Sequence, residues 1–492
     1  MRNKIAFIVQ LLFFSISLSS AQKITFTESE QIDNKNLAYE IIGKANENLV
    51  IYKKINKTHY ICFYDQEMKI IKNIELEKIP SNALKLNFVN SNECLLIIFQ
   101  YIKNNKIYCD AVRYFYDNQT IKWDGNLLQT KNEIFSNEDR FIVSVSENKK
   151  SILIYKLESN QKKYILDSKN YDNNLNVIDS CHYDFSYSST KDYCSDLIIN
   201  NEGDYFFAKQ TKKRFLDNYE TLEILYHHIH SDSLISIPVP LQNNYINPVL
   251  LKSDNLNKNL ILNSFYLSEI KDNVIGLFSA TIKPDKKIIT KIKFNFFGDS
   301  LRMSVRSLLR NKYRLDNLQL QSMILKKNGG FALLAEDISS EIQYTNFNNS
   351  NNLSTTNSYY NGSYLGNNQN NRVTKYNYND ILIMNLDSSL SMSSYNVINK
   401  TQYDFDDENH LSYFFMNTGK EIQFLFSDNY NKTNIVNNLS LYPNGEITRH
   451  ATLKNVDKEF EYMPKFAKQI GTYKLVLPFL YQKKLGFAKV EW

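Results

Sequence analysis

The sequence predicts an all-β protein, a β-propeller of about seven or eight blades formed by one domain over residues 22–492. First, short apolar runs separated by polar turns recur in sets of three or four over about 40 residues, which is typical of radial repetition. Second, the 34 Tyr and 30 Phe favour strands. Third, helical periodicity is almost absent after Leu49. A single β-sandwich of this length would be unusual.

The stretch of residues 327–390 shows the blade pattern most clearly. Asn328-Gly329-Gly330 can supply the positive φ of a tight turn. Residues 331–335 and 381–384 are short apolar runs with the length of buried strands. Strand, turn and strand in this order predict one antiparallel blade.

The other strands are predicted from apolar runs of similar length, and the last set is one strand short. Residues 23–28 can supply the missing strand, so we expect N- and C-terminal strands to close the ring. In chain order the predicted strands are 49–54, 59–65 and 69–76; 84–89, 94–102 and 107–116; 141–146, 151–157 and 162–167; 204–210, 222–230 and 234–241; four between 249 and 297; those of 327–390; four between 410 and 453; and 466–471, 473–481 and 483–492.

One segment, residues 299–314, has helical rather than strand periodicity. We expect one short helix here, lying over a junction between blades. An amphipathic membrane helix is the alternative, but the apolar stripe is interrupted. The apolar face consists of Leu301, Val305, Leu308 and Leu309, with Asp299 or Ser300 as the N-cap.

The polar segment 344–379 interrupts the blade of residues 327–390. It contains almost no aliphatic residues and is expected to be a mobile insertion. Tyr359, Tyr360 and Tyr364 can make it a binding loop, and a disordered insertion without a binding role is the alternative.

Residues 1–21 have the features of a signal peptide. Arg2 and Lys4 form a basic start, residues 5–18 are mostly apolar, and small residues precede the expected cleavage after Ala21. We therefore expect an exported protein, periplasmic or extracellular.

The charge balance is mild. The formal charge is +6, and two of these charges belong to the leader, which leaves +4 on the mature chain. Such an excess, spread along the sequence, argues against nucleic acid as a partner. No later apolar run is long enough to span a bilayer as a helix, so no transmembrane anchor is expected in the mature chain.

Five cysteines leave at least one unpaired in an oxidising compartment. Cys181 and Cys194 flank a polar loop and are candidates for a disulfide. Cys62, Cys94 and Cys109 lie in apolar strand patterns, where buried free thiols are expected.

Residues 300–492 resemble uncharacterised exported β-propeller-like proteins of Bacteroidetes. The resemblance is carried by a Gly-Gly-Phe strand that ends in Ala-Glu, a Tyr/Asn-rich insertion, then Asn-Asp-Ile-Leu and Asn-Leu-Asp. Residues 387–390 depart from it, because they lack the glycine usual before the last strand. The resemblance implies a secreted propeller and implies no activity.

The histidines at 227–230 include the best local candidate for a metal site. If they continue a strand, His228, His230 and Asp232 share one face, an arrangement that can bind zinc. No further protein ligand is identifiable, and an exposed strand end with hydrogen-bonded histidines is the alternative.

An acidic loop offers oxygen ligands of the kind that Ca²⁺ prefers. It lacks the spacing and the turn glycine of a calcium-binding loop, and a solvated acidic turn is the alternative. Its residues are Asp404, Asp406, Asp407 and Glu408.

No catalytic motif is present: the sequence has no Gly-x-Ser-x-Gly elbow, no His-Glu-x-x-His and no Gly-rich phosphate loop, so catalytic residues are unknown. The leading hypothesis is a non-catalytic exported propeller that binds a protein or glycan, with no cofactor expected beyond a possible Ca²⁺ or Zn²⁺. A carbohydrate-active hydrolase or lyase is the first alternative. An outer-membrane β-barrel, suggested by the aromatic C-terminus at Trp492, is the second.

Overall fold

The computed structural model describes most of the chain after the leader. The predicted signal peptide lies outside the described residues. Described are residues 22–492 except 32–37, 131–140, 161–162, 189, 214–216, 270–272, 306–307, 310–311, 314, 346–370, 429–434 and 454–459.

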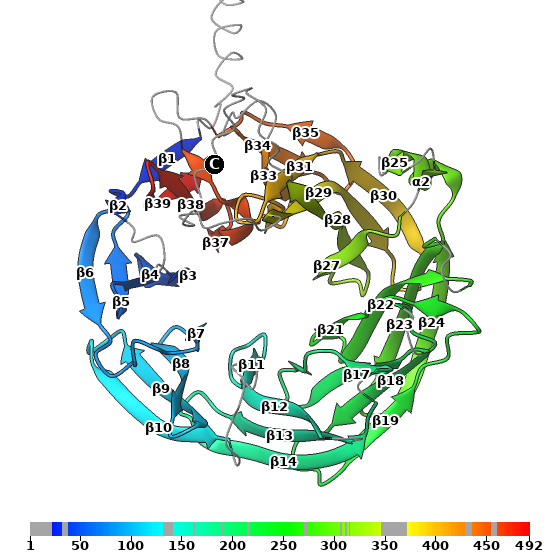
Figure 1. The fold of residues 1–492 in the computed structure, drawn as a ribbon, viewed down its shortest axis with the longest axis horizontal. Coiled ribbons are helices and arrows are strands. Elements are labelled where there is room, and N and C mark those ends of the chain that lie inside the picture. The colour runs from blue at the N-terminus through cyan, green and yellow to red at the C-terminus, as the bar shows by residue number, and fades with distance from the viewer. Residues whose placement is uncertain are drawn as a thin grey trace, which may run out of the picture. The chain divides into compact units, whose positions relative to one another are not determined.

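The fold is a β-propeller of eight blades, as predicted from the strand sets (Figure 1). Each blade is an antiparallel sheet of four to six strands, in which most neighbouring strands are also consecutive in the chain. The chain divides into two compact units, which are described separately. The first unit contains three blades and the second contains five.

Two blades of the first unit are simple four-stranded sheets. Their chain segments are far apart in sequence, near residues 38–75 and 413–449. The strands are β3 (Ala38–Ala45), β4 (Asn48–Ile55), β5 (Thr58–Tyr64) and β6 (Ile70–Glu75), and β32 (Tyr413–Asn417), β33 (Ile422–Asp428), β34 (Ile435–Leu441) and β35 (Ile447–Arg449).

The third blade of the first unit combines both ends of the described chain. Lys23 pairs with Glu491 and Phe26 pairs with Ala488, so the first strand adds to the last one. This confirms the prediction that residues 23–28 complete the final blade. The elements are β1 (Lys23–Phe26), β2 (Glu30–Gln31), β36 (Glu461–Tyr462), η2 (Pro464–Phe466), β37 (Lys468–Gly471), β38 (Lys474–Tyr481) and β39 (Lys484–Glu491).

The second unit contains five blades that follow one another along the chain (Figure 1). The strands are β7 (Lys85–Asn90), β8 (Cys94–Lys103), β9 (Lys106–Phe115) and β10 (Ile121–Gln129); β11 (Ile142–Val145), β12 (Ile152–Asn160), β13 (Lys163–Tyr171) and β14 (Val177–Ser186); β15 (Asp192–Cys194), β16 (Ile198–Ile199), β17 (Tyr205–Thr211), β18 (Thr221–His227) and β19 (Leu234–Pro238); β20 (Tyr245–Ile246), β21 (Leu250–Asp254), β22 (Asn259–Leu267), β23 (Gly276–Lys283) and β24 (Ile288–Phe296); and β27 (Leu318–Leu325), β28 (Phe331–Thr345), β29 (Asn371–Leu386), β30 (Met392–Ile398) and β31 (Gln402–Phe405).

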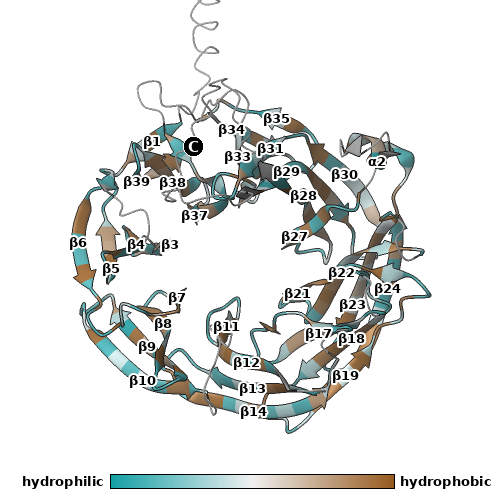
Figure 2. Ribbon diagram, in the orientation of Figure 1, coloured by the Kyte–Doolittle hydropathy of each residue, from teal (hydrophilic) through white to brown (hydrophobic). Residues whose placement is uncertain are grey.

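Hydrophobic clusters join consecutive blades within each unit. Strand β12 shows how, because its side chains alternate between the two faces of its sheet. Ile152 and Ile154 pack in a cluster shared with the β7–β10 blade, whereas Leu153 and Tyr155 pack in a cluster shared with the β15–β19 blade. Figure 2 shows the same division along the chain, with hydrophobic residues on the strands and hydrophilic ones in the connecting turns. Burial on both faces explains why the strand sequences read as continuous apolar runs.

The predicted helix is present but shorter than its pattern indicated. Helix α2 (Asp299–Ser304) has six residues, and the chain then forms the small strands β25 (Leu308–Leu309) and β26 (Lys312–Tyr313). Leu301 and Val305 are buried between the β20–β24 and β27–β31 blades, as expected for a helix over a blade junction. The helix does not extend to Leu308 and Leu309, because these two residues form strand β25 and pair with β26.

The insertion in the β27–β31 blade is shorter than predicted. Strand β28 continues to Thr345 and β29 begins at Asn371, so the two ends of the predicted loop 344–379 are strand. The extension pairs Ile338 with Tyr378 and continues beyond the rest of the sheet, where β31 adds to it. The extension lies outside the interblade core, so most of its residues are polar. A polar sequence of this kind resembles that of a loop.

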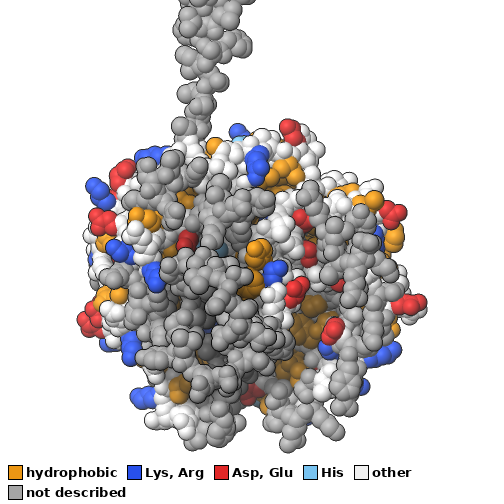
Figure 3. All heavy atoms as spheres, turned by 45° about the horizontal axis from the view of Figure 1, so that its top comes forward, with side chains coloured by type: hydrophobic (Ala, Val, Ile, Leu, Met, Phe, Trp, Pro, Cys, Tyr) orange, Lys and Arg blue, Asp and Glu red, His pale blue; other side chains and the backbone are white. Residues whose placement is uncertain are grey.

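Charged side chains of both signs are interspersed on the face shown in Figure 3, as the mild net charge predicts. The described part of the chain contains no apolar helix of membrane-spanning length.

Candidate functional site

A cavity of about 800 Å³ lies between the β7–β10 and β11–β14 blades. Lys156 and Glu158 follow Ile152 and Ile154 on the same face of β12, so strand alternation directs them into this interblade space. Asp167 lies directly across from Lys156 on β13. The lining comprises Asn126, Leu127, Leu128, Gln129, Thr130, Phe141, Lys156, Glu158, Ile165, Asp167, Ser168, Lys169, Ser180, Cys181 and His182.

Both carboxylates of the cavity lie beside basic side chains. Lys156 forms an ion pair with Glu158. His182 Nδ1 lies 2.8 Å from Asp167 Oδ1 on the neighbouring strand. Lys169 Nζ donates to the carbonyl oxygen of Leu127 at 3.4 Å. The cavity therefore presents a polar surface in which both carboxylates have a basic partner.

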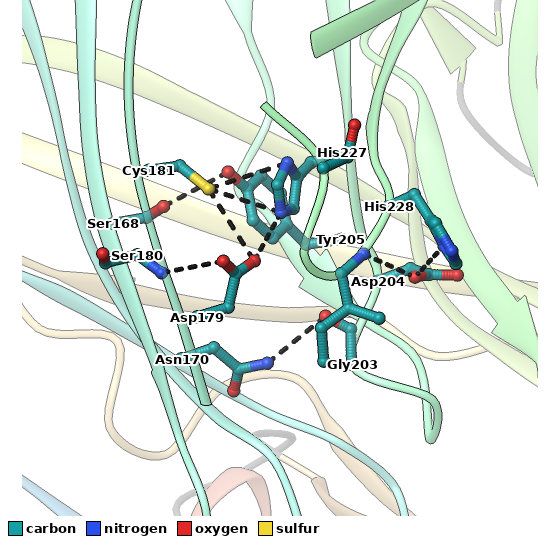
Figure 4. A network of polar contacts seen from close by, with 12 residues as sticks. Ser168, Asn170, Asp179, Ser180, Cys181, Gly203, Asp204, Tyr205, His227 and His228 are labelled. Atoms are coloured by element: carbon teal, nitrogen blue, oxygen red, sulfur yellow. Dashed lines mark hydrogen bonds and ion pairs between the residues drawn. The ribbon is translucent and has the colours of Figure 1, made fainter. Parts of the chain in front are cut away.

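The opposite face of β14 carries a second polar group of residues, between the β11–β14 and β15–β19 blades (Figure 4). Asp179, Cys181 and Tyr183 alternate along β14 and therefore point to the same side. His227 is the last residue of β18 and is fully buried. The potential ligand atoms of Asp179, Cys181 and His227 all lie within 4.8 Å of one another.

One imidazole nitrogen is the centre of this cluster. His227 Nε2 lies 2.6 Å from Asp179 Oδ2 and 3.3 Å from Cys181 Sγ. On the other side of the ring, Nδ1 lies 3.0 Å from the hydroxyl of Tyr183. Tyr205 stacks on the imidazole with ring centroids 4.5 Å apart, and its hydroxyl is 3.2 Å from Ser168 Oγ.

Burial shifts the pKa of Cys181 and of the two tyrosines beside it. It raises the pKa of the Cys181 thiol, and the nearby Asp179 carboxylate acts in the same direction. The neighbouring Tyr205 hydroxyl opposes this shift, because a hydroxyl donor stabilises a thiolate. Burial also raises the pKa of both tyrosines.

The zinc site predicted at His228, His230 and Asp232 required these residues to lie on one strand, and they do not. Strand β18 ends at His227, and His230 lies in a turn with φ of 61°. His228 Nδ1 is 2.8 Å from Asp204 Oδ1, and Asp204 lies directly before β17. The expectation that the two histidines share a strand face is therefore wrong, and metal binding by these residues stays a prediction.

Each of the four acidic residues predicted to hold Ca²⁺ accepts a hydrogen bond from a different donor. Asp404 lies in β31, and its Oδ1 accepts from the backbone N–H of Phe405. The other three carboxylates accept from different partners: Asp406 Oδ1 from Thr374 N–H, Asp407 Oδ1 from Asn409 N–H, and Glu408 Oε1 from the Tyr378 hydroxyl. Burial raises the pKa of Asp404. Calcium binding here stays a prediction.

The predicted disulfide is not formed. Cys181 and Cys194 are free thiols, as are Cys62, Cys94 and Cys109. Cys181 lies in β14 and Cys194 in β15 of the next blade, and the Cys181 sulfur contacts His227 instead. The expected burial of the other three thiols is confirmed.

The predicted binding loop with Tyr359, Tyr360 and Tyr364 lies outside the described residues.

Sequence reasoning missed the cluster of Asp179, Cys181 and His227. A signal was present in the alternation of Asp179, Cys181 and Tyr183 within one strand. This signal did not lead to a prediction, because Cys181 was predicted to form a disulfide and the metal site was predicted at His228 and His230. His227 points to the other side of the strand end and is the histidine that is buried.

Neither protein families nor curated proteins gave a match to this sequence. Solved structures with a similar arrangement include a prolyl endopeptidase (8% identity, TM-score 0.39, covering 91% of this chain and 55% of that one). An ulvan lyase of family PL25 is 10% identical, with TM-score 0.36 and coverage of 81% and 90%. The apocarotenoid oxygenase of Synechocystis is 9% identical, with TM-score 0.35 and coverage of 95% and 93%. The chain thus spans about half the length of the prolyl endopeptidase.

Proposed function

We propose that the chain is an exported binding module that takes a neutral polar ligand, a glycan, in the cavity between the β7–β10 and β11–β14 blades. The observation that carries this proposal is that both carboxylates of that cavity have a basic side chain as partner, Glu158 with Lys156 and Asp167 with His182. A surface with paired charges offers donors and acceptors without a strong excess of either sign, which suits a ligand rich in hydroxyl groups.

The remaining lining supports the same class of ligand. Amide and hydroxyl side chains of Asn126, Gln129 and Thr130 lie beside the apolar groups of Leu128 and Phe141. Sugars present hydroxyls at the ring edge and C–H groups on the ring face, so they need both kinds of contact.

The same pairing favours binding over glycoside hydrolysis. Glu158 and Asp167 share one face of the sheet, and two carboxylates are what a glycosidase uses. One of the two must hold a proton to act as general acid. Lys156 and His182 each engage one of these carboxylates, so neither carboxylate is directed at a ligand alone.

The test is a glycan array of neutral polysaccharides and oligosaccharides, probed with the wild-type protein and with Asp167→Asn. Loss of a charge-assisted hydrogen bond is expected to weaken binding about tenfold or more. Glu223→Gln is the matched control, because Glu223 lies in β18, outside the cavity lining, and is hydrogen-bonded to Ser236. Its binding is expected to equal that of the wild type.

Incubation of the bound polysaccharide with the protein separates binding from catalysis. We expect the polysaccharide to be recovered intact. New reducing ends or unsaturated sugars that disappear with Asp167→Asn would instead establish the hydrolase or lyase alternative. If the protein binds immobilised peptides and no glycan, the proposal that its ligand is a glycan is refuted.

A further inference from the structure

Three side chains of different chemistry converge at the junction of the β11–β14 and β15–β19 blades. Asp179 Oδ2 and Cys181 Sγ lie 2.6 and 3.3 Å from His227 Nε2, and 3.7 Å from each other. Carboxylate, thiolate and imidazole are the three kinds of side chain that bind zinc in proteins. The cluster borders the glycan cavity, because Cys181 also belongs to the cavity lining, whereas Asp179 and His227 do not.

The geometry differs from that of a cysteine nucleophile with its base. In such a triad the acid binds one imidazole nitrogen and the nucleophile the other. Here Asp179 approaches Nε2, the same nitrogen to which the Cys181 sulfur is nearer (3.3 Å, against 3.7 Å to Nδ1), and Nδ1 lies 3.0 Å from the Tyr183 hydroxyl. Burial also raises the pKa of the Cys181 thiol, the opposite of what an activated nucleophile needs.

The hydrogen bonds of Tyr183 indicate which nitrogen is protonated. Its hydroxyl donates to the carbonyl oxygen of Ser231 at 3.2 Å, and a carbonyl can only accept. Toward His227 the same hydroxyl oxygen is therefore an acceptor, which places the ring hydrogen on Nδ1. Nε2 and the Asp179 carboxylate oxygen, 2.6 Å apart, then share one cation, which is either a proton on Nε2 or a metal ion bound by both atoms.

We propose that Asp179, Cys181 and His227 form a Zn²⁺ site with three protein ligands and a fourth position for water. Zinc bonds of 2.0–2.3 Å in a tetrahedron place the ligand atoms roughly 3.3–3.6 Å apart. Of the two distances that involve sulfur, 3.3 Å lies in this range and 3.7 Å exceeds it by about 0.1 Å. The distance from Asp179 Oδ2 to His227 Nε2 must widen by about 0.7 Å to reach it.

Neighbouring groups hold the ligands in orientation. The backbone N–H of Ser180 donates to Asp179 Oδ1 at 2.9 Å, which leaves Oδ2 for the metal. The Nδ1–Tyr183 bond fixes the imidazole, and Tyr205 stacks against its face. Such partners are usual around zinc ligands. The thiolate favours zinc over Ca²⁺ or Mg²⁺, which prefer oxygen ligands.

The test is metal uptake by the full-length mature protein, measured by dialysis against Zn²⁺ and elemental analysis. We expect one Zn²⁺ per chain. Cys181→Ser and Asp179→Asn, which preserve size, are expected to weaken binding about tenfold or more. Co²⁺ in place of Zn²⁺ is expected to give a thiolate-to-cobalt charge-transfer band that is absent from Cys181→Ser.

His228→Gln is the matched control, since it changes the adjacent histidine and removes a ligand of the site predicted from sequence. Its zinc content is expected to equal that of the wild type. Circular dichroism establishes that each variant is folded, and Zn²⁺ should raise the Tm of the wild type but not of Cys181→Ser. The proposal is overturned if the wild type takes up no zinc, if folded Cys181→Ser binds it equally, or if His228→Gln abolishes binding.

Discussion

Lys400 Nζ lies 2.6 Å from Glu336 Oε1, and the two side chains are 1% and 0% exposed. Lys400 Nζ also donates to the carbonyl oxygen of Tyr378 and to Gln402 Oε1, and Glu336 Oε2 accepts from Ser412 Oγ at 2.6 Å. The pair lies where the long hairpin β28–β29 leaves the core of its blade, beside the register shift that follows Glu336. Burial lowers the pKa of Lys400, and the Glu336 carboxylate opposes that shift.

Removing one partner of this pair should destabilise the protein strongly. Lys400→Met leaves the Glu336 carboxylate buried without its cation, which typically costs about 3–5 kcal/mol. We expect the free energy of unfolding, measured by urea denaturation, to fall by that amount. The double variant Lys400→Met/Glu336→Gln should recover part of the loss, because the uncompensated charge is gone.

An exposed pair supplies the control for this prediction. Lys163 and Asp184 lie 3.4 Å apart with side chains 64% and 44% exposed. Lys163→Met should change the free energy of unfolding by less than about 1 kcal/mol. If Lys400→Met and Lys163→Met lower the free energy of unfolding equally, burial of the ion pair does not determine the loss.

The strands could be predicted because interblade packing makes most of them apolar on both faces. Residues 331–335 and 381–384 are buried on both sides, and such a run is visible in the sequence without knowledge of its partners. The extension of β28 and β29 was missed for the converse reason. Beyond Ile338 its residues leave the core, so pairing between the two strands, rather than hydrophobicity, holds them together.

The polar cluster could not be predicted from local spacing. Asp179 and His227 are 48 positions apart, and they meet because β14 and β18 belong to adjacent blades. Which of three histidines is buried depends on where β18 ends, and strand ends are poorly marked in this sequence. Asn-rich turns replace the usual glycines, as at Asn104 and Asn105, which both have positive φ.

Gly276 should not tolerate a side chain. A Cβ at this buried position of β23 would lie against the carbonyl oxygen of Asn295 and the ring of Tyr266. Gly276→Ala must therefore shift backbone, and we expect it to lower the free energy of unfolding by about 1–3 kcal/mol. Gly125→Ala is the control, since the nearest atom to its Cβ would be 3.9 Å away. Thermal melts that rank Gly125→Ala as the worse change would refute this.

Stability should decrease at alkaline pH, partly because of Cys109. Burial raises the pKa of this thiol from 9.0 to about 12. The unfolded chain then releases the proton at lower pH than the folded chain, so the stabilisation is complete below pH 9 and is lost as pH rises toward 12. Cys109→Ala should reduce the slope of unfolding free energy against pH in that window by up to about 1.4 kcal/mol per unit. Between pH 6 and 8 its slope should match that of the wild type, and an unchanged alkaline slope would exclude this role.

Helix α2 should stabilise the junction of two blades through Leu301. This side chain is 2% exposed and packs with Val305 in the core between the β20–β24 and β27–β31 blades. Leu301→Ala should lower the free energy of unfolding by about 2–5 kcal/mol, because it removes buried methyl groups and leaves a cavity. Met303 lies two residues further in the same helix and is 58% exposed, so Met303→Ala should cost under about 0.5 kcal/mol. The free energy of unfolding of both variants is measured by urea denaturation. Similar decreases for the two variants would mean that the buried face does not hold the helix in place.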